Sequence, residues 1–214
     1  MRKAKAKFIT FEGIDGCGKS TQAKRLVSRL NNEGIPALLT LEPGGTKIGS
    51  YIRRILLDPK NKDISELTEL FLYLADRSQH IKEVIAPSLR NGIWVISDRF
   101  YDATLAYQGF GRGICKDLIL MLNRHICGDI KPDITFLLDC PVEVAIKRRN
   151  KRDADQNQLR FEQEAVIFHE KVRKGYLWIA EQFKERVITV DATRSVEEIE
   201  EFIFDKIKEL FLRS

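Results

Sequence analysis

The sequence is short of the features that mark membrane, secreted and zinc-binding proteins. No apolar run approaches the roughly 18 residues that a membrane-spanning helix requires. The basic start is followed by an apolar stretch over residues 8–11 alone, which is too short for the core of a signal peptide. The four cysteines form no C-x-x-C pair and there are three histidines, so neither a zinc site nor a disulfide framework is expected. We therefore expect a cytoplasmic protein with free thiols and no membrane contact.

Internal repeats and linkers rich in proline, glycine or serine are also lacking. The 214 residues, 43% of them hydrophobic, are enough for one core, and we expect a single domain over residues 1–214. The net charge of +5 suits either nucleic acid or small polyphosphates. The sequence has no run of basic residues interleaved with aromatic residues of the kind that binds nucleic acid, so no nucleic-acid partner is expected.

Short apolar runs alternate with longer stretches of helical period, which is typical of an α/β protein. Strands are predicted near residues 7–12, 36–41, 93–98, 133–138 and 187–191. Their consecutive apolar residues suit parallel strands that are covered on both faces. The pattern therefore predicts a three-layer α/β/α fold with a five-stranded parallel sheet flanked by helices.

Helices are predicted between these strands from apolar residues spaced three and four apart. They follow Ser20, cover residues 67–89, begin near Pro141, cover residues 161–183, and begin at Ser195, where Ser195 and Glu198 form a capping box. The stretch 150–158 is polar and without apolar period. It is either a plain surface loop or part of a mobile lid, which we place at about residues 148–160.

Residues 13–20 match the phosphate-binding pattern G-x-x-x-x-G-K-[ST], between a predicted strand and a predicted helix. Successive backbone N–H groups of such a loop point at phosphate oxygens, and the helix N-terminus adds a positive end. Lys19 is expected to neutralise phosphate charge and Ser20 to bind Mg²⁺; an inert glycine turn is the alternative. The expected ATP-binding residues are Gly13, Ile14, Asp15, Gly16, Cys17, Gly18, Lys19, Ser20 and Thr21.

The pattern does not name the acceptor of the phosphoryl group, but three further segments bear on it. Residues 42–46 (Glu-Pro-Gly-Gly-Thr) follow the second strand, residues 98–100 (Asp-Arg-Phe) end the third, and residues 148–152 carry arginines. Ligands of open parallel sheets bind beyond the carboxyl ends of the strands. The first two segments are therefore expected beside the phosphate loop.

Together these segments resemble the bacterial thymidylate kinase family. The matching motifs are the loop of residues 11–21, Glu-Pro-Gly-Gly-Thr at 42–46, Ala-Asp-Arg at 75–77, Asp-Arg-Phe at 98–100, Ala-Tyr-Gln-Gly at 106–109, and Arg148 with Arg152. The resemblance extends from about residue 8 to about residue 191. It implies a P-loop kinase fold and transfer of the γ-phosphoryl group of ATP to dTMP, giving dTDP and ADP.

The resemblance also implies roles for residues near the acceptor phosphate. Arg99 is expected to bind that phosphate through its planar fork, against the alternative of a surface salt bridge. Asp98 is expected to support Mg²⁺ through water or to orient a neighbouring base. Asp15 is expected to accept a hydrogen bond from the sugar 3′-hydroxyl, and capping within the loop is its alternative. Arg53 reaches the phosphate or lies on a solvated helix face.

Tyr73 and Arg77 are four apart and share a helix face, where a ring and a guanidinium suit a pyrimidine. We expect Tyr73 to stack on thymine and Arg77 to donate to its O4. Thr104 is expected to contact the base and Tyr107 the sugar, where it disfavours a 2′-hydroxyl. The full set expected to bind dTMP is Asp15, Glu42, Pro43, Arg53, Tyr73, Arg77, Arg99, Thr104, Tyr107 and Gln108.

The lid segment is assigned to the ATP side of the reaction. One branch of the family has an arginine at the position of Gly16, and members with glycine there supply lid arginines instead, which Arg148 and Arg152 match. With Lys19, Asp98 and Arg99, these two arginines complete the expected catalytic set. Three departures from the family pattern, at Leu41, Ala103 and Leu159, put fine positioning in doubt more than the reaction class.

Three other functions remain open at this stage: another pyrimidine nucleoside-monophosphate kinase, a deoxynucleoside kinase and a nucleic-acid-associated ATPase. A deoxynucleoside kinase also has a P-loop and an Asp-Arg strand end, but it requires a general base. Glu42 could be mistaken for that base, whereas the Pro-Gly-Gly-Thr that follows it and the pair Tyr73 and Arg77 favour the monophosphate kinase. A nucleic-acid-associated ATPase requires a water-activating residue that the sequence does not show. Members of the resembled family are typically homodimers, so a homodimer is expected.

Overall fold

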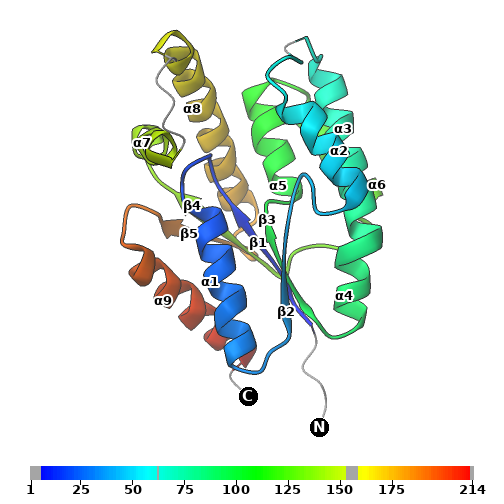
Figure 1. Ribbon diagram of the computed structural model, residues 1–214, viewed down its shortest axis with the longest axis vertical. Coiled ribbons are helices and arrows are strands. Elements are labelled where there is room, and N and C mark those ends of the chain that lie inside the picture. Colours follow the sequence, from blue (N-terminus) through cyan, green and yellow to red (C-terminus); the bar gives the residue numbers. More distant parts are fainter. Residues whose placement is uncertain (1–5, 62, 153–158, 213–214) are drawn as a thin grey trace.

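A five-stranded parallel sheet forms the centre of the protein (Figure 1). The computed structural model describes residues 6–61, 63–152 and 159–212. The strands are β1 (Phe8–Glu12), β2 (Ala37–Leu41), β3 (Trp94–Asp98), β4 (Ile134–Asp139) and β5 (Val187–Asp191), and their spatial order is β2-β3-β1-β4-β5. Each neighbouring pair is parallel. The five predicted strands are confirmed.

Helices cover both faces of this sheet. They are α1 (Lys19–Asn32), α2 (Lys47–Leu57), α3 (Glu66–His80), α4 (Ala86–Arg90), α5 (Tyr101–Thr104), α6 (Lys116–Cys127), α7 (Val142–Arg152), α8 (Leu159–Gln182) and α9 (Val196–Ile207). π-helical segments at Ile81–Ile85, Leu105–Gly111 and Lys208–Leu212 continue α3, α5 and α9. Figure 1 shows α1 beside α9 on one side of the molecule, and α2, α3 and α6 grouped on the other.

Alternate residues of the central strands pack into two apolar clusters. Ile9 and Ile96 belong to the large cluster that includes the α1 residue Leu26, whereas Phe8 and Val95 pack with Ile85 and Cys127 in a second one. Successive side chains of a strand point to opposite faces of a sheet. The strands are therefore buried on both sides, which explains their continuous apolar runs and confirms the three-layer architecture.

The predicted capping box of α9 is confirmed: Ser195 accepts from the Glu198 amide, and the Glu198 side chain accepts from the Ser195 amide. The sequence analysis did not predict α6. Its residues 118–122 are all apolar, so the helical period is hidden in a continuous run. Within the described residues, no helix combines the length and apolar character that crossing a membrane requires.

Strands β1, β2 and β3 are parallel, so all three end at the same edge of the sheet. The phosphate loop follows β1, the Asp-Arg-Phe segment ends β3, and the Glu-Pro-Gly-Gly-Thr turn follows the neighbouring β2. The backbone N–H of Glu42 donates to the Asp98 carbonyl at 3.0 Å, which joins the second and third of these segments directly. The fold therefore gathers all three at the carboxyl edge, as expected.

Candidate active site

The phosphate loop is built from glycines that no other residue could replace without strain. Gly13 has φ +135° and Gly16 has φ +91°, a region that side chains rarely adopt. A Cβ at Gly13 would lie 2.5 Å from the Leu138 carbonyl oxygen, and one at Gly16 would lie 2.2 Å from that of Ala145. The loop is thus packed against the end of β4 and the start of α7, and Gly16 leaves no room for the arginine found there in one branch of the family that the sequence resembles.

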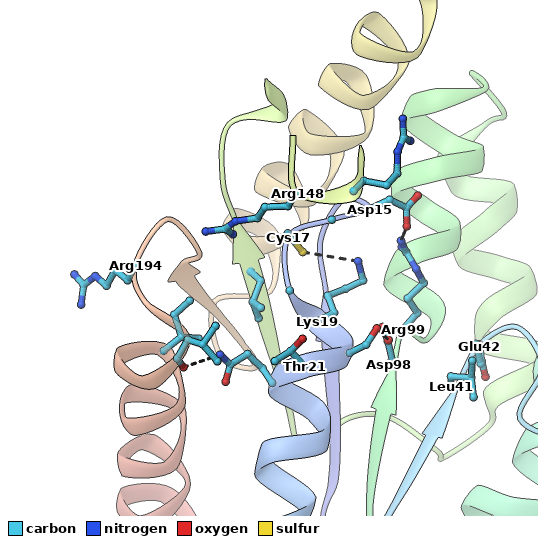
Figure 2. Close-up of a pocket in the computed structure, with 18 of the residues that line it drawn as sticks. Asp15, Cys17, Lys19, Thr21, Leu41, Glu42, Asp98, Arg99, Arg148 and Arg194 are labelled. Carbon is cyan, nitrogen blue, oxygen red and sulfur yellow. Dashed lines mark hydrogen bonds and ion pairs between the residues drawn. The ribbon is translucent and has the colours of Figure 1, made fainter. Parts of the chain in front are cut away.

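Lys19 is the first residue of α1 and directly follows this loop. Its ammonium donates to the Ile14 carbonyl at 2.9 Å and contacts the Cys17 sulfur at 3.8 Å, as the dashed line in Figure 2 shows. Next to it, the Ser20 hydroxyl donates to the Asp98 carboxylate. A cation, a hydroxyl and a carboxylate therefore meet at the mouth of the loop.

A cleft of about 530 Å³ opens over the phosphate loop. Its walls carry residues 15–22, the strand-end residues Asp98 and Arg99, and the cations Arg148, Arg149 and Arg194. Val196 and Ile199 of α9 give one wall an apolar surface. The cleft thus offers amides and cations for a polyphosphate, and an apolar wall beyond them.

A second cavity of about 130 Å³ adjoins the first. All ten residues expected to bind dTMP line it, together with Leu57, Phe100 and Ala103. Asp15, Glu42, Arg53 and Arg99 line both cavities, so these side chains form the boundary between them. The structure brings the predicted acceptor residues together at the mouth of the phosphate loop.

Arg99 occupies the centre of this boundary. Its Nη2 donates to Asp15 at 2.5 Å and to the Tyr107 hydroxyl at 3.0 Å, and its Nη1 donates to the Tyr176 hydroxyl at 3.1 Å. Figure 2 shows its guanidinium pointing toward Asp15. Burial opposes the charge of Arg99, but Tyr107 and Asp15 outweigh it and raise the pKa of the guanidinium. Arg99 therefore stays charged and is no exposed surface salt bridge.

Asp15 and Tyr107 form the other half of this cluster. Burial raises the pKa of the Asp15 carboxyl, but Arg99 and then Lys19 lower it by more, so the pKa lies well below its usual range. The Tyr107 hydroxyl donates to the second Asp15 oxygen at 3.1 Å. Burial raises the pKa of Tyr107, which keeps the hydroxyl protonated. Asp15 is therefore an ionised acceptor facing the second cavity.

Arg77 is more buried, and forms more hydrogen bonds within the protein, than we expected of a base-binding residue. It is 1% exposed, and it donates to Glu42, Asn123, Thr104 and the Phe100 carbonyl. Four of the five N–H groups of its guanidinium are thereby used, which leaves one on Nη1. Arg77 lines the second cavity mainly as a buried anchor of its wall.

Glu42 is equally engaged, and it is not placed as a free general base. One of its oxygens accepts from Arg77 Nε at 2.9 Å, and the other lies 2.9 Å from His80 Nδ1. Its side chain is nearly inaccessible to solvent. A carboxylate tied to two buried partners cannot readily take a proton from a substrate hydroxyl, which was its expected function in a deoxynucleoside kinase.

The predicted lid residues are described in part. Arg148 lies at the first cavity and donates from Nη1 to the Ala192 carbonyl at 2.7 Å, so it joins α7 to the loop after β5. The side chain of Arg152 and the segment 153–158 lie outside the described residues. Arg53 donates to the Pro43 carbonyl at 2.7 Å and faces both cavities, which places it beside the acceptor segment.

Several residues of the site escaped the sequence analysis. Arg194 lines the first cavity and lies 3.6 Å from Asp191; Arg149, which lies within the predicted lid segment, lines the same cavity. Buried Glu12, whose pKa burial and Asp102 raise to about 8, accepts from Tyr176. The apolar period of α8 places Tyr176 in the core and does not mark its hydroxyl as part of the site. The signal for Glu12 was a carboxylate ending an otherwise apolar strand.

His169 of α8 is another residue without a sequence signal. Its ring lies edge-on to Tyr107 with 6.5 Å between ring centroids. Its Nδ1 is buried and has no hydrogen-bond partner among the described residues. Burial lowers its pKa, and of the charges around it Asp15 opposes this shift. His169 is therefore a neutral ring that packs against Tyr107 at the second cavity.

A glycine loop of the phosphate-binding pattern, a hydroxyl–carboxylate pair and two adjoining cavities with an arginine between them are typical of a P-loop phosphotransferase. The sequence model of the thymidylate kinase family matches residues 11–203. The chain belongs to this family, and it is a dTMP kinase.

Individual relatives agree with this assignment. The thymidylate kinase of Geotalea daltonii is 50% identical over 195 residues, which cover 89% of this chain and 91% of that protein. The thymidylate kinase of Pelobacter propionicus is 48% identical over 203 residues, 94% of this chain and 93% of that protein. The crystal structure of thymidylate kinase from Ehrlichia chaffeensis superposes with a TM-score of 0.76 at 33% identity, covering 94% of this chain and 98% of that one.

Proposed function

We propose that ATP binds in the larger cavity and dTMP in the smaller one, and that Arg99 lies between the two at the point of phosphoryl transfer. The observation that carries this proposal is the shared wall, since Asp15, Arg53 and Arg99 line both cavities. Phosphoryl transfer depends mainly on positioning and on neutralising charge. A donor and an acceptor held across one cationic wall meet that need.

On the donor side, the backbone amides of residues 13–21 hold the phosphates and Lys19 neutralises their charge. The Lys19 ammonium lies at the loop mouth, where it exchanges its bond to the Ile14 carbonyl for a phosphate oxygen. The apolar wall of Val196 and Ile199 packs against the adenine. Arg194 and Arg149 line the same cavity and supply further positive charge.

Ser20 and Asp98 are the residues that hold Mg²⁺. Their side-chain oxygens are in direct contact, so both can reach one small cation and its waters. Oxygen donors of this kind fit Mg²⁺, which binds proteins through few side chains and completes its shell with water and phosphate. When bound, Mg²⁺ supplies charge neutralisation to the phosphates.

On the acceptor side, Arg99 and Arg53 bind the phosphate of dTMP and Asp15 accepts from the 3′-hydroxyl. Tyr107 lies beside Asp15 and excludes a 2′-hydroxyl. Tyr73 stacks on thymine, and the free N–H of Arg77 donates to O4. The remaining residues, Glu42, Pro43, Thr104 and Gln108, form the wall of the base pocket.

The lid arginines Arg148 and Arg152 stabilise charge on the transferring phosphoryl group and exclude water. We assign them to a lid of about residues 148–160 within one domain over residues 1–214. The anchoring of Arg148 to the Ala192 carbonyl supports its assignment to the donor side, since that carbonyl precedes the Arg194 loop.

The protein acts as a homodimer in the cytoplasm, on small-molecule nucleotides and without nucleic-acid or membrane partners. An apolar surface supports the dimer: Ile48, Tyr51 and Ile55 of α2, Leu67 and Phe71 of α3, and Met121 of α6 are exposed. These helices lie side by side in Figure 1. Large apolar patches on helices mark surfaces that another chain covers, and a second copy uses this patch isologously.

The proposal is tested by measuring ADP formation from ATP and Mg²⁺ with dTMP, thymidine, dUMP and TMP (the ribonucleotide) as acceptors. Phosphorylation of dTMP in preference to thymidine and to the ribonucleotide is expected. Arg99→Ala should raise the KM for dTMP and leave the KM for ATP nearly unchanged. Equal use of thymidine, or an Arg99→Ala enzyme with wild-type KM values, would contradict the assigned acceptor site.

A further inference from the structure

The backbone of Arg99 adopts a conformation that neighbouring contacts must stabilise. Its φ is +75°, and it is the single non-glycine residue with positive φ in the part of the chain that the structure describes. Such a conformation is strained and persists only where neighbouring contacts enforce it. Two of these contacts involve the backbone of Arg99 itself. The Ser97 hydroxyl donates to the Arg99 carbonyl at 2.7 Å, and the Arg99 amide donates to the Phe11 carbonyl of β1 at 3.0 Å.

The third contact comes from Glu12 at the end of β1. One of its carboxyl oxygens accepts from the Phe100 amide at 2.7 Å, immediately after the strained residue. The other oxygen accepts from the Tyr176 hydroxyl at 2.8 Å. That hydroxyl in turn accepts from Arg99 Nη1 at 3.1 Å. Glu12 thus fixes Arg99 at both ends, its backbone directly and its guanidinium through Tyr176.

Burying the Glu12 carboxyl costs free energy that packing of β1 does not require. Glu12 is 1% exposed, and burying a carboxyl is unfavourable unless its oxygens are satisfied. The other β1 residues from Phe8 to Phe11 are buried too, so packing alone would be met by an apolar side chain at position 12. Glu12 lines neither of the two cavities, so it does not touch the nucleotides. Its contacts with the site are the Phe100 amide, which follows Arg99, and the Tyr176 hydroxyl, which accepts from the Arg99 guanidinium.

We propose that Glu12 is a positioning residue, which holds Arg99 in the strained conformation that aims its guanidinium at the acceptor phosphate. This inference rests on the proposed binding of that phosphate by Arg99. Tyr176 extends the same control to α8, because its hydroxyl is the link between Glu12 and the guanidinium. Through the Tyr176 hydroxyl, α8 is therefore joined both to the guanidinium of Arg99 and to the buried Glu12 carboxyl.

The test compares the binding of dTMP and thymidine by calorimetry, since the two ligands differ only in the phosphate. Glu12→Met keeps the side-chain length and removes both acceptor oxygens. It should weaken dTMP binding about tenfold, the upper end of the effect of losing an ordinary hydrogen bond, and leave thymidine binding unchanged. Tyr176→Phe removes the link alone and should weaken dTMP binding about threefold, again without affecting thymidine.

Two further variants separate the possible results. Asp139→Asn weakens the bond between β4 and Arg173 of α8, at 2.7 and 2.9 Å, without touching Arg99, and its dTMP binding should match wild type. Arg99→Ala reports on the underlying assignment: if it does not weaken dTMP more than thymidine, the role of Arg99 itself is wrong. If Arg99→Ala is selective for dTMP but Glu12→Met and Tyr176→Phe weaken both ligands equally, or neither, the positioning role is overturned. Unchanged thymidine binding also shows that each variant is folded.

Discussion

At the scale of single residues, the site is built from charges that are paired before any nucleotide contacts them. Arg99 is paired with Asp15, Arg77 with Glu42, and Lys19 with a loop carbonyl. Buried ions cost desolvation, and well-placed partners offset that cost. A change to one partner of a pair therefore leaves the other uncompensated and destabilises the folded protein.

The Arg77–Glu42 pair provides a direct test of this view. Arg77→Met leaves the Glu42 carboxylate buried with one partner fewer, and should lower the free energy of unfolding by about 3–5 kcal/mol. Denaturant unfolding followed by circular dichroism measures the loss. The double variant Arg77→Met with Glu42→Gln removes the stranded charge and should recover part of it. A double variant as unstable as the single one would show that packing, and not charge, dominates.

Asp76 carries a pH dependence that can be worked out in sign. Its side chain is fully buried, one oxygen has no partner among the described residues, and burial followed by Glu42 raises its pKa to about 6. Because the folded protein holds this proton more tightly than the unfolded chain, the carboxyl costs stability as pH rises from about 4 to about 6. Asp76→Asn has no such loss. Its stability relative to wild type should grow by about 3 kcal/mol across that window.

Urea unfolding of both proteins at pH 3.5, 5 and 7 measures this difference. Other titrating groups cancel because both proteins contain them. A relative stability that stays constant, or that moves in favour of wild type as pH rises, would contradict a raised pKa for Asp76.

At the scale of secondary structure, the phosphate loop and α7 are fitted to one another. Gly16 meets the Ala145 carbonyl of α7, and this contact leaves no space for a Cβ. Gly34, after α1, has a similar positive φ of +77° but open space around it. Both glycines have positive φ, but only at Gly16 would an added Cβ meet a neighbouring atom.

Gly16→Ala should therefore lower kcat/KM for ATP by about 100-fold, because the loop must shift by about an ångström at the phosphates. Gly34→Ala is the matched control and should cost only about 1 kcal/mol of stability, with wild-type kinetics. Steady-state assays and thermal unfolding of both variants separate the effects. Wild-type ATP kinetics in Gly16→Ala would show that α7 moves away freely.

The elements themselves were largely predictable. Strand bounds, the capping box of α9 and the strand–loop–helix context of residues 13–20 all follow from patterns of near neighbours. The helix α6 was missed because its apolar residues 118–122 run without a break. The π-helical stretch Ile81–Ile85 inside the predicted long helix was missed as well, since the spacing of its apolar residues fits an ordinary helix.

At the scale of the whole molecule, the apolar surface of α2, α3 and α6 is the proposed contact between two copies. If two copies join there, Phe71→Glu buries a charge against the partner and should convert the dimer to a monomer. Sedimentation equilibrium at micromolar concentration measures the change. Met121→Glu should act alike, whereas Ile167→Glu, an equally exposed apolar residue on α8, should leave the dimer intact. A wild-type protein that is monomeric throughout would contradict the proposed assembly.

The sequence by itself determined the phosphate loop, the five strands and the set of residues around the smaller cavity, because each depends on residues close together in the chain or on motifs read as a group. Only the tertiary structure decided which of those residues are free and which are bound. The Glu12–Tyr176 bond joins residues 164 apart, and the Arg77–Glu42 bond joins residues 35 apart. Such partners are chosen by how the layers pack, since burial makes a charge seek whatever polar group the fold places beside it.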